Sequence, residues 1–421
     1  MSSESISLSK KEATSFGTVR LTGSKSECNR ALILNALSKG IVQVENVSSA
    51  DDTVTLDTIL KDLRNSGSQT KNPATQIVDI GPAGTAMRFL TAFLSVTGQE
   101  VIITGTERMK QRPIGLLVDA LRDLGAEITY TEKDGFPPLK FSKNFSQKKR
   151  QVQLKGNVSS QYITALLLVA PTLPLGLELE IIGELTSKPY VEMTLAMLTE
   201  TGIGYSWKGS VIDIPQQPFK TSTLTVEPDW SAASYWYSIA ALSDTAEIDL
   251  PFLKQNSLQG DSAIARIMES FGIRSEFYDK GVKISKHPKE ITETFFDFKD
   301  CPDLAQTVVV CCAALGHNAS FTGLETLKIK ETDRVKALQN ELAKIGVRFT
   351  ENNQTYHLDC SGLHFPDTVT IATYEDHRMA MAFAPLALKI SKVIIEDPKV
   401  VGKSYPAFWN HLESVGFVIK S

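Results

Sequence analysis

Six segments of the chain are apolar on nearly all sides, a pattern that predicts helices buried inside the protein rather than helices at its surface. Short runs of polar or small residues precede each segment, and such residues favour the first positions of a helix. The six apolar segments are 31–37, 86–96, 165–169, 232–242, 304–315 and 379–388. We therefore expect six buried helices, distributed over the whole chain.

A second set of helix-like segments ends each time at a glycine, and the apolar or β-branched residues that follow are typical of strands. Glycine at this position favours a left-handed helix C-cap. The clear glycines are Gly125, Gly202, Gly272, Gly346 and Gly416, and a looser copy spans 59–67. The clear glycines are separated by 77, 70, 74 and 70 residues. Spacing this regular indicates an internal structural repeat.

Each repeat of about 70 residues contains one buried helix, one more amphipathic helix and strand-like segments such as Val101–Thr104 and Val393–Glu396. The pattern predicts an α/β fold with two domains, built from six βαβαββ-like units, three in each domain. We expect the first domain over residues 24–228 and the second over 229–421, with residues 1–23 as an N-terminal strand of the second.

Composition excludes several classes of function. The chain has 421 residues and a net charge of -4, which argues against a general nucleic-acid-binding protein but allows a local basic pocket. The five cysteines match no disulfide framework and the six histidines show no metal-ligand spacing, so we expect neither a metal nor another cofactor. The sequence shows no secretory signal and no apolar stretch of membrane-spanning length, and we expect a cytoplasmic protein.

Basic residues gather near the predicted helix starts, where a cation opposes the positive end of the helix dipole. An anionic ligand would satisfy both the cations and the free backbone N–H groups. Taken singly, a Ser, Thr, Asp or Gly at such a start is better explained as an N-cap. The segment 22–26 lacks the upstream glycine of a P-loop, which excludes an NTPase of that type. The basic residues are Lys25, Arg30, Arg88, Arg112, Arg378 and Lys403.

Two further segments carry charges whose role this pattern leaves open. Lys330 and Arg334 are four residues apart, a spacing typical of an exposed, salt-bridged helix start as well as of a binding site. Asp303 precedes an apolar helix, where an N-cap and a partly buried general base are both compatible with the pattern.

The chain resembles the family of 5-enolpyruvylshikimate-3-phosphate synthases in motifs that follow the family order over nearly the whole length. The most specific are Lys330-Glu331-Thr332-Asp333-Arg334 and Asp376-His377-Arg378-Met379-Ala380-Met381. Further motifs lie at 23–32, 83–88, 108–114, 159–161, 187–190 and 402–403. The resemblance implies the two-domain inverted α/β barrel-like fold of enolpyruvyl transferases, with the active site in the cleft between the domains.

The resemblance also implies a reaction. The enolpyruvyl group of phosphoenolpyruvate would be transferred to the 5-hydroxyl of shikimate 3-phosphate, with release of phosphate. This is a step of the shikimate pathway to chorismate and the aromatic amino acids, and it is the target of the herbicide glyphosate. Pro82 and Phe89 depart from the common family pattern and leave glyphosate sensitivity open.

Individual residues receive roles from the same resemblance. For shikimate 3-phosphate it implies Lys25, Ser26, Arg30, Ser159, Ser160, Gln161, Ser187, Tyr190, Asp303 and Lys330. For phosphoenolpyruvate it implies Lys25, Gly84, Arg112, Gln161, Arg334, Arg378 and Lys403. The catalytic residues are expected to be Asp303, which takes the hydroxyl proton, and Glu331, which with Lys25 transfers protons at phosphoenolpyruvate.

Charge supports these roles. The two substrates together carry roughly five to six negative charges, which the basic side chains of the site oppose. Without ligands these cations would repel one another, and we expect domain closure on the substrates to relieve the repulsion.

Three other functions fit parts of the pattern. UDP-N-acetylglucosamine enolpyruvyl transferase shares the implied fold but usually carries a loop cysteine near Arg112, and residues 107–113 contain none. An RNA-terminal phosphate cyclase needs a nucleophilic histidine, which has no recognisable context here. A non-catalytic repeat scaffold would not require Asp303, Glu331 and Lys25 in their present contexts. We expect a monomer, because the repeats need no partner to complete their cores.

Overall fold

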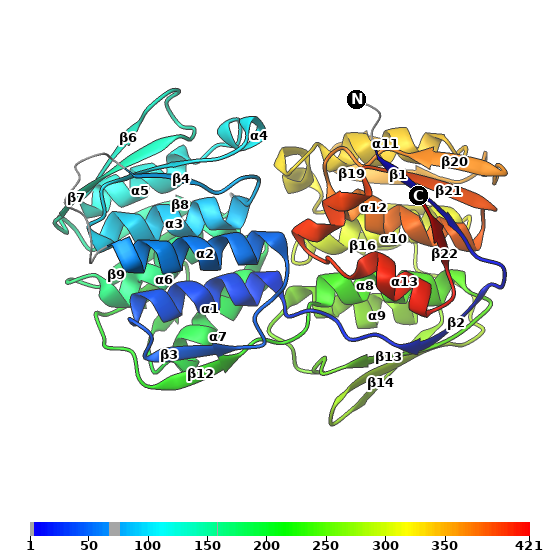
Figure 1. Cartoon of the computed structure of the whole chain (residues 1–421), viewed down its shortest axis with the longest axis horizontal. Helices are drawn as coiled ribbons and strands as arrows, with labels where there is room; N and C mark the ends of the chain where they lie inside the picture. The colour runs from blue at the N-terminus through cyan, green and yellow to red at the C-terminus, as the bar shows by residue number, and fades with distance from the viewer. Residues whose placement is uncertain (1–3, 67–75, 158) are drawn as a thin grey trace. The chain divides into compact units, whose positions relative to one another are not determined.

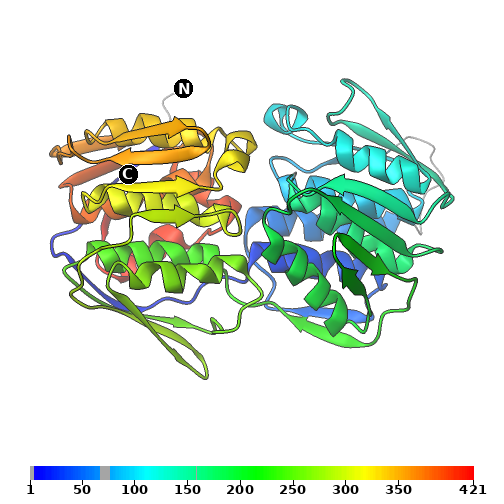
Figure 2. The same cartoon turned by 180° about the vertical axis from the view of Figure 1, so that it is seen from behind.

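The computed structural model describes residues 4–66, 76–157 and 159–421. The chain folds into two compact units. One contains the N-terminal residues to Ser24 together with Glu227–Ser421, and the other contains Lys25–Val226. In each unit the strands lie on the outside and long helices run through the interior (Figures 1 and 2).

The unit Lys25–Val226 alternates helices and strands from its first residue. Its helices are α1 (Lys25–Leu37), α2 (Asp51–Ser66), α3 (Gly84–Thr97), α4 (Glu107–Lys110), α5 (Gly115–Leu124), α6 (Ser160–Val169), the 3-10 helix η1 (Ala170–Thr172) and α7 (Lys188–Glu200). Its strands are β3 (Val42–Glu45), β4 (Gln76–Asp79), β5 (Val101–Thr104), β6 (Ala126–Tyr130), β7 (Leu139–Phe145), β8 (Gln151–Lys155), β9 (Leu177–Ile182), β10 (Ser206–Lys208), β11 (Val211–Ile214) and β12 (Ser222–Thr225).

The other unit is built in the same way and includes the N-terminal strands. Its strands are β1 (Ser5–Ser9), β2 (Thr14–Thr18), β13 (Thr245–Pro251), β14 (Ile273–Tyr278), β15 (Gly281–Lys286), β16 (Phe295–Asp297), β17 (Ala319–Thr322), β18 (Arg348–Asn352), β19 (Thr355–Asp359), β20 (Thr368–Ile371), β21 (Lys392–Glu396) and β22 (Val418–Lys420). Its helices are α8 (Trp230–Leu242), α9 (Ala263–Glu269), α10 (Ala305–Ala314), α11 (Arg334–Ala343), α12 (His377–Phe383) and α13 (Phe408–Ser414). Short 3-10 helices connect them: η2 (Gly260–Ser262), η3 (Pro302–Leu304), η4 (Glu325–Ile329), η5 (Ala384–Leu388) and η6 (Pro398–Lys403).

One strand order recurs in five sheets of the described chain. Two parallel strands lie at one edge, and an antiparallel pair completes the four, as in β4-β5-β7-β6 and β16-β17-β19-β18. The other orders are β10-β11-β9-β8, β14-β15-β13-β2 and β20-β21-β1-β22. This arrangement is consistent with the predicted βαβαββ-like units.

Two features depart from a uniform repeat. The sheet β12-β3 is a single parallel pair among the described residues. The N-terminal segment supplies two strands rather than one, and they enter different sheets: β1 lies between β21 and β22, and β2 pairs with β13.

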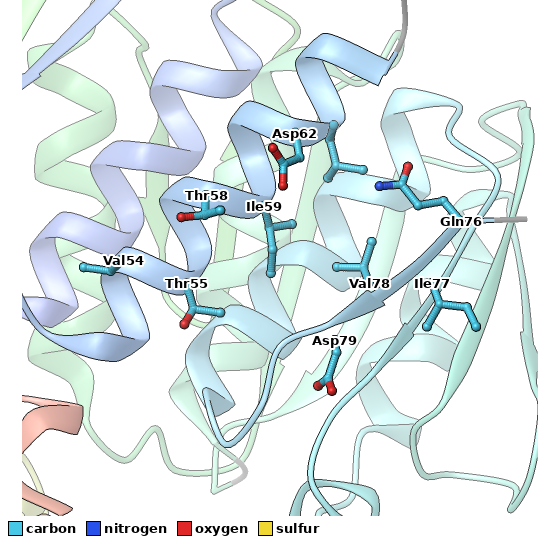
Figure 3. A pocket seen from close by; sticks show the side chains of 10 residues that line it. Val54, Thr55, Thr58, Ile59, Asp62, Gln76, Ile77, Val78 and Asp79 are labelled. Carbon is cyan, nitrogen blue, oxygen red and sulfur yellow. The ribbon is translucent and has the colours of Figure 1, made fainter. Parts of the chain in front are cut away.

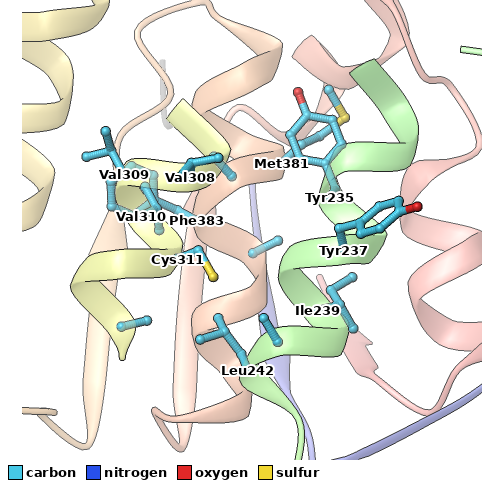
Figure 4. Packing of buried hydrophobic residues seen from close by; sticks show 14 of the residues in the cluster. Tyr235, Tyr237, Ile239, Leu242, Val308, Val309, Val310, Cys311, Met381 and Phe383 are labelled. Carbon is cyan, nitrogen blue, oxygen red and sulfur yellow. The ribbon is translucent and has the colours of Figure 1, made fainter. Parts of the chain in front are cut away.

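Three buried helices form the interior of each unit, and the six apolar segments of the sequence account for them. In one unit α1, α3 and α6 contact each other, and in the other α8, α10 and α12 do so. Figure 4 shows Tyr235 of α8, Val308 of α10 and Met381 of α12 within one packed cluster. Every residue of α10 is buried, so its apolar character on all sides follows from packing on all sides.

The five repeated glycines end their helices in the conformation that the sequence predicts. Their φ angles are 116° at Gly125, 85° at Gly202, 78° at Gly272, 75° at Gly346 and 93° at Gly416. Left-handed backbone of this kind is readily adopted only by glycine. Gly125 is itself the C-cap of α5, as predicted, whereas α7, α9, α11 and α13 have Thr201, Ser270, Lys344 and Val415 at the C-cap and the glycine one or two residues later. Gly67 of the looser copy lies outside the described residues.

The cysteines and histidines give no sign of a metal centre. All five cysteines are free and buried. In the part of the chain that the structure describes, no three His, Cys, Asp or Glu side chains are grouped to hold a metal ion. No helix in these ranges is long and apolar enough to cross a membrane.

Gly125 provides a test of the repeat geometry. A Cβ at this position would lie 2.0 Å from the carbonyl oxygen of Ser146, so we expect Gly125→Ala to lower the free energy of unfolding by roughly 3 kcal/mol or more. Gly209→Ala is the matched control in the same unit. It also has positive φ, but a Cβ there meets nothing within 4 Å, so only the conformational cost of about 1–2 kcal/mol is expected. Urea unfolding measures both, and equal losses would contradict the clash.

Candidate functional site

The predicted site residues fall into two sets, one in each unit. In the unit Lys25–Val226 most of them lie at or just before the starts of α1, α3, α6 and α7. The parallel strands β8 and β9 end at the same edge of their sheet, so the loops that follow them are neighbours. The backbone N–H of Thr186, before α7, accordingly donates to the carbonyl of Gly156, before α6, at 3.1 Å.

Arg30 is buried in α1, and its guanidinium connects α1 to α6 and α7. Nε donates to Thr194 Oγ1 at 2.9 Å, and Nη2 donates to Thr164 Oγ1 and to the Tyr190 carbonyl, both at 3.2 Å. Nη1 donates to the carbonyl of Ser26 at 2.7 Å. Burial lowers the pKa of Arg30 to about 10. These four hydrogen bonds use most of the five donors of a guanidinium, so a ligand can receive few from Arg30.

Gly84 is the first residue of α3, and the guanidinium of Arg112 lies against it. A Cβ at position 84 would be 2.4 Å from Arg112 Nη1, so glycine leaves the room that this arginine occupies. The side-chain amide of Gln161 in α6 donates to Thr85 Oγ1 at 3.1 Å and thereby links two helix starts. A buried cation beside free backbone N–H groups is a favourable arrangement for an anion.

Arg88 has a structural role. Its Nη1 donates to the Gly84 carbonyl at 3.0 Å and its Nη2 to the Pro113 carbonyl at 3.2 Å. These bonds hold the segment after Arg112 against α3. The neighbouring Phe89 lies within the unbroken helix, and its ring centre is 5.6 Å from the guanidinium carbon of Arg30.

Serines occupy the starts of α6 and α7. Ser159 is the N-cap of α6, where its Oγ accepts from the backbone N–H of Gln161 at 3.4 Å, and Ser160 is the first helical residue. Ser187 precedes α7 with a φ of 55° and makes no side-chain capping bond to the helix. Backbone strain of this kind in a residue other than glycine is concentrated at binding sites.

Lys25, the first residue of α1, has a carboxylate partner that the sequence did not indicate. Its Nζ lies 3.1 Å from Asp52 Oδ2 in the first turn of α2, and the two side chains are 14% and 4% exposed. The start of α2 is acidic, with Asp51 and Asp52 in its first turn, but nothing in the local sequence points to Lys25.

In the unit containing Glu227–Ser421, Arg334 is at the centre of the second set. Its guanidinium binds three carboxylates: Asp376 Oδ2 at 2.7 Å, Glu331 Oε2 at 2.9 Å and Asp303 Oδ1 at 3.1 Å. The side chain is only 2% exposed, so an exposed, salt-bridged helix start is the wrong interpretation of this segment. The helix α11 begins at Arg334, and Lys330 therefore lies before the helix rather than on a face shared with Arg334.

Asp303 does not cap the helix that follows it. It lies in η3, and the residue at the N-cap of α10 is Leu304. Its Oδ2 is 2.9 Å from Arg378 Nη2, while Oδ1 faces Arg334. Burial by itself would raise the pKa of Asp303, but Arg378, Lys330 and Arg334 outweigh burial and hold the pKa well below its ordinary value. Asp303 is therefore ionised and a weak base in this state.

Glu331 connects the remaining predicted residue to this cluster. Its Oε1 lies 3.4 Å from Lys403 Nζ, and its Oε2 faces Arg334. The structure thus brings Asp303, Lys330, Glu331, Arg334, Arg378 and Lys403 together within one unit.

Two carboxylates of the cluster were missed as site residues. Asp376 is the N-cap of α12, where its Oδ1 accepts from the backbone N–H of Arg378 at 2.8 Å, and it belongs to a motif already noted. Asp261 lies in η2, accepts a hydrogen bond from Ser231 Oγ, and is 3% exposed. No helix or motif signal marks Asp261 in the sequence.

Charges in this cluster are balanced rather than in excess. Arg378 and Lys403 each face a carboxylate that also binds Arg334, so carboxylates oppose the predicted repulsion among the cations of this unit. Repulsion is still present, because Arg378 acts to lower the pKa of Arg334.

A cavity of about 390 Å³ lies elsewhere, between α2 and β4 (Figure 3). Its lining includes the carboxylates Asp62 and Asp79 and no basic side chain. It contains none of the predicted site residues and is unsuited to an anionic ligand.

Comparison with known proteins identifies the family to which these features belong. Residues 10–412 match the family described as EPSP synthase (3-phosphoshikimate 1-carboxyvinyltransferase). A 3-phosphoshikimate 1-carboxyvinyltransferase of Bacteroides fragilis is 46% identical over 405 residues, which cover 96% of this chain and 96% of the relative. The enzyme of the same name from Neisseria meningitidis serogroup B is 35% identical over 416 residues, covering 94% of this chain and 95% of the relative. These names do not favour the UDP-N-acetylglucosamine alternative.

Solved structures share the fold. An EPSP synthase from Acinetobacter baumannii superposes with a TM-score of 0.78 at 19% identity, covering 99% of this chain and all of the other. The enolpyruvyl transferase NikO from Streptomyces tendae superposes with a TM-score of 0.72 at 14% identity and covers 99% of both chains. The predicted α/β fold of enolpyruvyl transferases is confirmed.

Asp261 predicts a specific pH dependence of stability. Burial and then Asp303 raise its pKa from 3.8 to about 7, so between these values the native state binds a proton that the unfolded state has lost. Stability should therefore fall as pH rises through this window, by roughly 4 kcal/mol in total. The stability of Asp261→Asn, always neutral, should exceed that of the wild type in thermal unfolding by a larger margin near pH 8 than near pH 5. Equal stabilisation at both pH values would contradict the shifted pKa.

Proposed function

The chain belongs to the EPSP synthase (3-phosphoshikimate 1-carboxyvinyltransferase) family, and we propose that it transfers the enolpyruvyl group of phosphoenolpyruvate to the 5-hydroxyl of shikimate 3-phosphate and releases phosphate. The observation that carries the proposal is the cluster of Asp303, Glu331 and Arg334 with Arg378 and Lys403. It combines cations for a substrate carboxylate and phosphate with two carboxylates that can carry protons.

Both substrates need residues from both units. We therefore assign one active site to two domains, 24–228 and 229–421 with 1–23, whose side chains meet around the ligands. Shikimate 3-phosphate is assigned to Lys25, Ser26, Arg30, Ser159, Ser160, Gln161, Ser187, Tyr190, Asp303 and Lys330. Phosphoenolpyruvate is assigned to Lys25, Gly84, Arg112, Gln161, Arg334, Arg378 and Lys403. The helix starts and the Gly84–Arg112 packing support the phosphate positions.

Asp303 is the proposed base. When the carboxylate of phosphoenolpyruvate binds Arg378 and Arg334, it replaces Asp303 at these guanidinium groups. Loss of the two favourable partners raises the pKa of Asp303 from its present low value, so the substrate itself converts Asp303 into a useful base. The hydroxyl proton then passes to Asp303 as the substrate oxygen forms its bond to C2 of phosphoenolpyruvate.

Glu331 and Lys25 complete the proton transfers. The C3 methylene gains a proton from Glu331 as the new C–O bond forms at C2. Glu331 then takes a proton back from C3 as the bond between C2 and the bridging oxygen breaks, which restores the double bond. Lys25 donates a proton to the bridging oxygen, so that the leaving group departs as hydrogen phosphate. Asp303 releases the hydroxyl proton to solvent and Lys25 regains one, which restores both side chains. Lys25 stabilises the negative charge that develops on the bridging oxygen.

The cellular location and the oligomeric state are proposed together with the function. Five free cysteines, all buried, suit a reducing compartment, and we assign the enzyme to the cytoplasm. We assign a monomer, because each unit packs its own buried helices.

Substrate identity has a direct test. Purified chain mixed with phosphoenolpyruvate should release inorganic phosphate when shikimate 3-phosphate is added, and not when UDP-N-acetylglucosamine is added. A coupled assay for phosphate measures both. Release with the UDP-sugar alone would overturn the assignment, and phosphoenolpyruvate without an acceptor is the control for simple hydrolysis.

The base is tested by Asp303→Asn, which removes the acceptor of the hydroxyl proton and keeps the shape of the side chain. We expect kcat to fall by roughly 10²–10⁴-fold, the range of general base contributions. Asp300→Asn, an exposed carboxylate three residues earlier, is the matched control and should keep wild-type activity. Near-normal kcat for Asp303→Asn with an unchanged pH profile would show that another group accepts the proton.

A further inference from the structure

Asp261 is buried beneath the charged cluster and has no part in the proposed chemistry. Its carboxyl is 3% exposed and accepts one hydrogen bond, from Ser231 Oγ to Oδ2. Its Oδ1 is buried without a hydrogen-bond partner in the described part of the chain. A carboxylate in such a site is costly in its charged form, since only one of its two oxygens is satisfied.

Ser231 connects this carboxyl to Arg378. The Ser231 hydroxyl oxygen lies 3.4 Å from Arg378 Nη2, and the same Nη2 is 2.9 Å from Asp303 Oδ2. The arginine is also held from other directions, by the Tyr235 hydroxyl at 3.5 Å and the Asp303 carbonyl at 3.3 Å, both facing Nη1. Arg378 Nη2 therefore contacts Asp303 directly and is connected to Asp261 through the Ser231 hydroxyl.

The charge on Asp261 decides how strongly Arg378 attracts a further anion. When Asp261 is ionised, the carboxylates Asp261, Asp303, Glu331 and Asp376 equal in number the cations Lys330, Arg334, Arg378 and Lys403. When Asp261 is neutral, one positive charge is in excess and is available to a substrate carboxylate.

We propose that Asp261 is a positioning residue that sets the affinity of Arg378 for the carboxylate of phosphoenolpyruvate, acting through the Ser231 hydroxyl and through its own charge. The proposal rests on the proposed function, in which Arg378 binds this substrate. When Asp261 is protonated, Arg378 binds the substrate carboxylate more tightly. When Asp261 is ionised, its negative charge weakens that binding.

The groups that face Asp261 bring its pKa close to neutral pH. Burial and then Asp303 raise its pKa to about 7, Asp229 also raises it, and Arg378 and the Ser231 hydrogen bond lower it. The thiol of Cys301 is a further neighbour, and its own pKa is raised by burial and by Asp261. The affinity for phosphoenolpyruvate should accordingly be high below this pH and fall above it.

The test compares KM for phosphoenolpyruvate in the wild type and in Asp261→Asn across a pH series. The ratio of the two KM values removes the titration of the substrate phosphate, which both enzymes share. We expect a ratio near one at about pH 5.5 and roughly ten at about pH 8.5, with its midpoint near the pKa of Asp261. We expect similar kcat values, because Asp261 does not touch the reacting atoms.

Ser231 variants provide a second, independent measurement. Ser231→Ala removes the hydrogen bond that lowers the pKa of Asp261, so the midpoint of the KM rise should move to higher pH. The same change removes the contact between Ser231 and Arg378, so the KM rise should also become smaller. Ser231→Thr keeps a hydroxyl and should keep the midpoint. Asp297→Asn, an exposed carboxylate of β16, controls for a general change in charge and should leave the profile as in the wild type.

The outcomes distinguish a failure of the proposed function from a failure of the proposed role of Asp261. A wild-type chain without activity toward phosphoenolpyruvate and shikimate 3-phosphate would overturn the proposed function. An active wild type whose KM profile runs parallel to that of Asp261→Asn would overturn the role of Asp261 alone. If Asp261→Asn does not fold, a midpoint unmoved by Ser231→Ala overturns it equally, and a midpoint shifted upward supports it.

Discussion

The guanidinium of Arg334 binds the carboxylates of Asp303, Glu331 and Asp376, and the site in its unit depends on these three ion pairs. Each carboxylate lies at the start of a helix or in the turn before it. The Arg334 side chain therefore fixes the N-terminal ends of α10, α11 and α12 relative to one another. A planar guanidinium suits this task because its donors point in fixed directions. Removing one partner from such a buried pair typically costs about 3–5 kcal/mol, since the remaining charges are left uncompensated.

The other cations are positioned through the same carboxylates. Asp303 also binds Arg378, and Glu331 also binds Lys403, so both cations are already oriented before any ligand arrives. In the proposed function, binding of a substrate carboxylate is an exchange of one carboxylate for another. Such an exchange avoids most of the desolvation cost of the cations and couples substrate binding to the proton affinity of the displaced side chain.

The unit Lys25–Val226 positions two of its cations differently, whereas its Lys25 pairs with the carboxylate of Asp52. Arg30 is held by hydroxyl and carbonyl oxygens, and Arg112 packs on the backbone at Gly84. Neutral oxygens and helix starts leave more positive potential than carboxylates do, which suits the binding of phosphate groups. The two units thus contribute different electrostatics to the proposed reaction, since the carboxylates Asp303 and Glu331 lie in one unit and the cations held by neutral oxygens or backbone lie in the other.

Much of the fold could be read from the sequence, because buried helices and their glycine ends are local signals. The segment 304–315 and Gly346 show this directly, the first as α10 and the second as a left-handed helix end. We predicted the N-terminal segment as one strand of the second domain, but its division into two strands of different sheets could not be read in this way. Strands β1 and β2 join different sheets, and their partners lie hundreds of residues away in the chain. The pattern of apolar and polar residues within a strand does not indicate which distant strand it pairs with.

The sequence by itself determined the repeat, the buried helices, the family and the types of residue that carry the chemistry. Only the tertiary structure decided which charged and polar side chains contact one another. Lys25 pairs with Asp52 across 27 residues, Arg334 with Asp376 across 42, and Ser231 with Asp261 across 30. An ion pair depends on the distance between two atoms and on their burial, and neither is encoded in the local pattern around either residue.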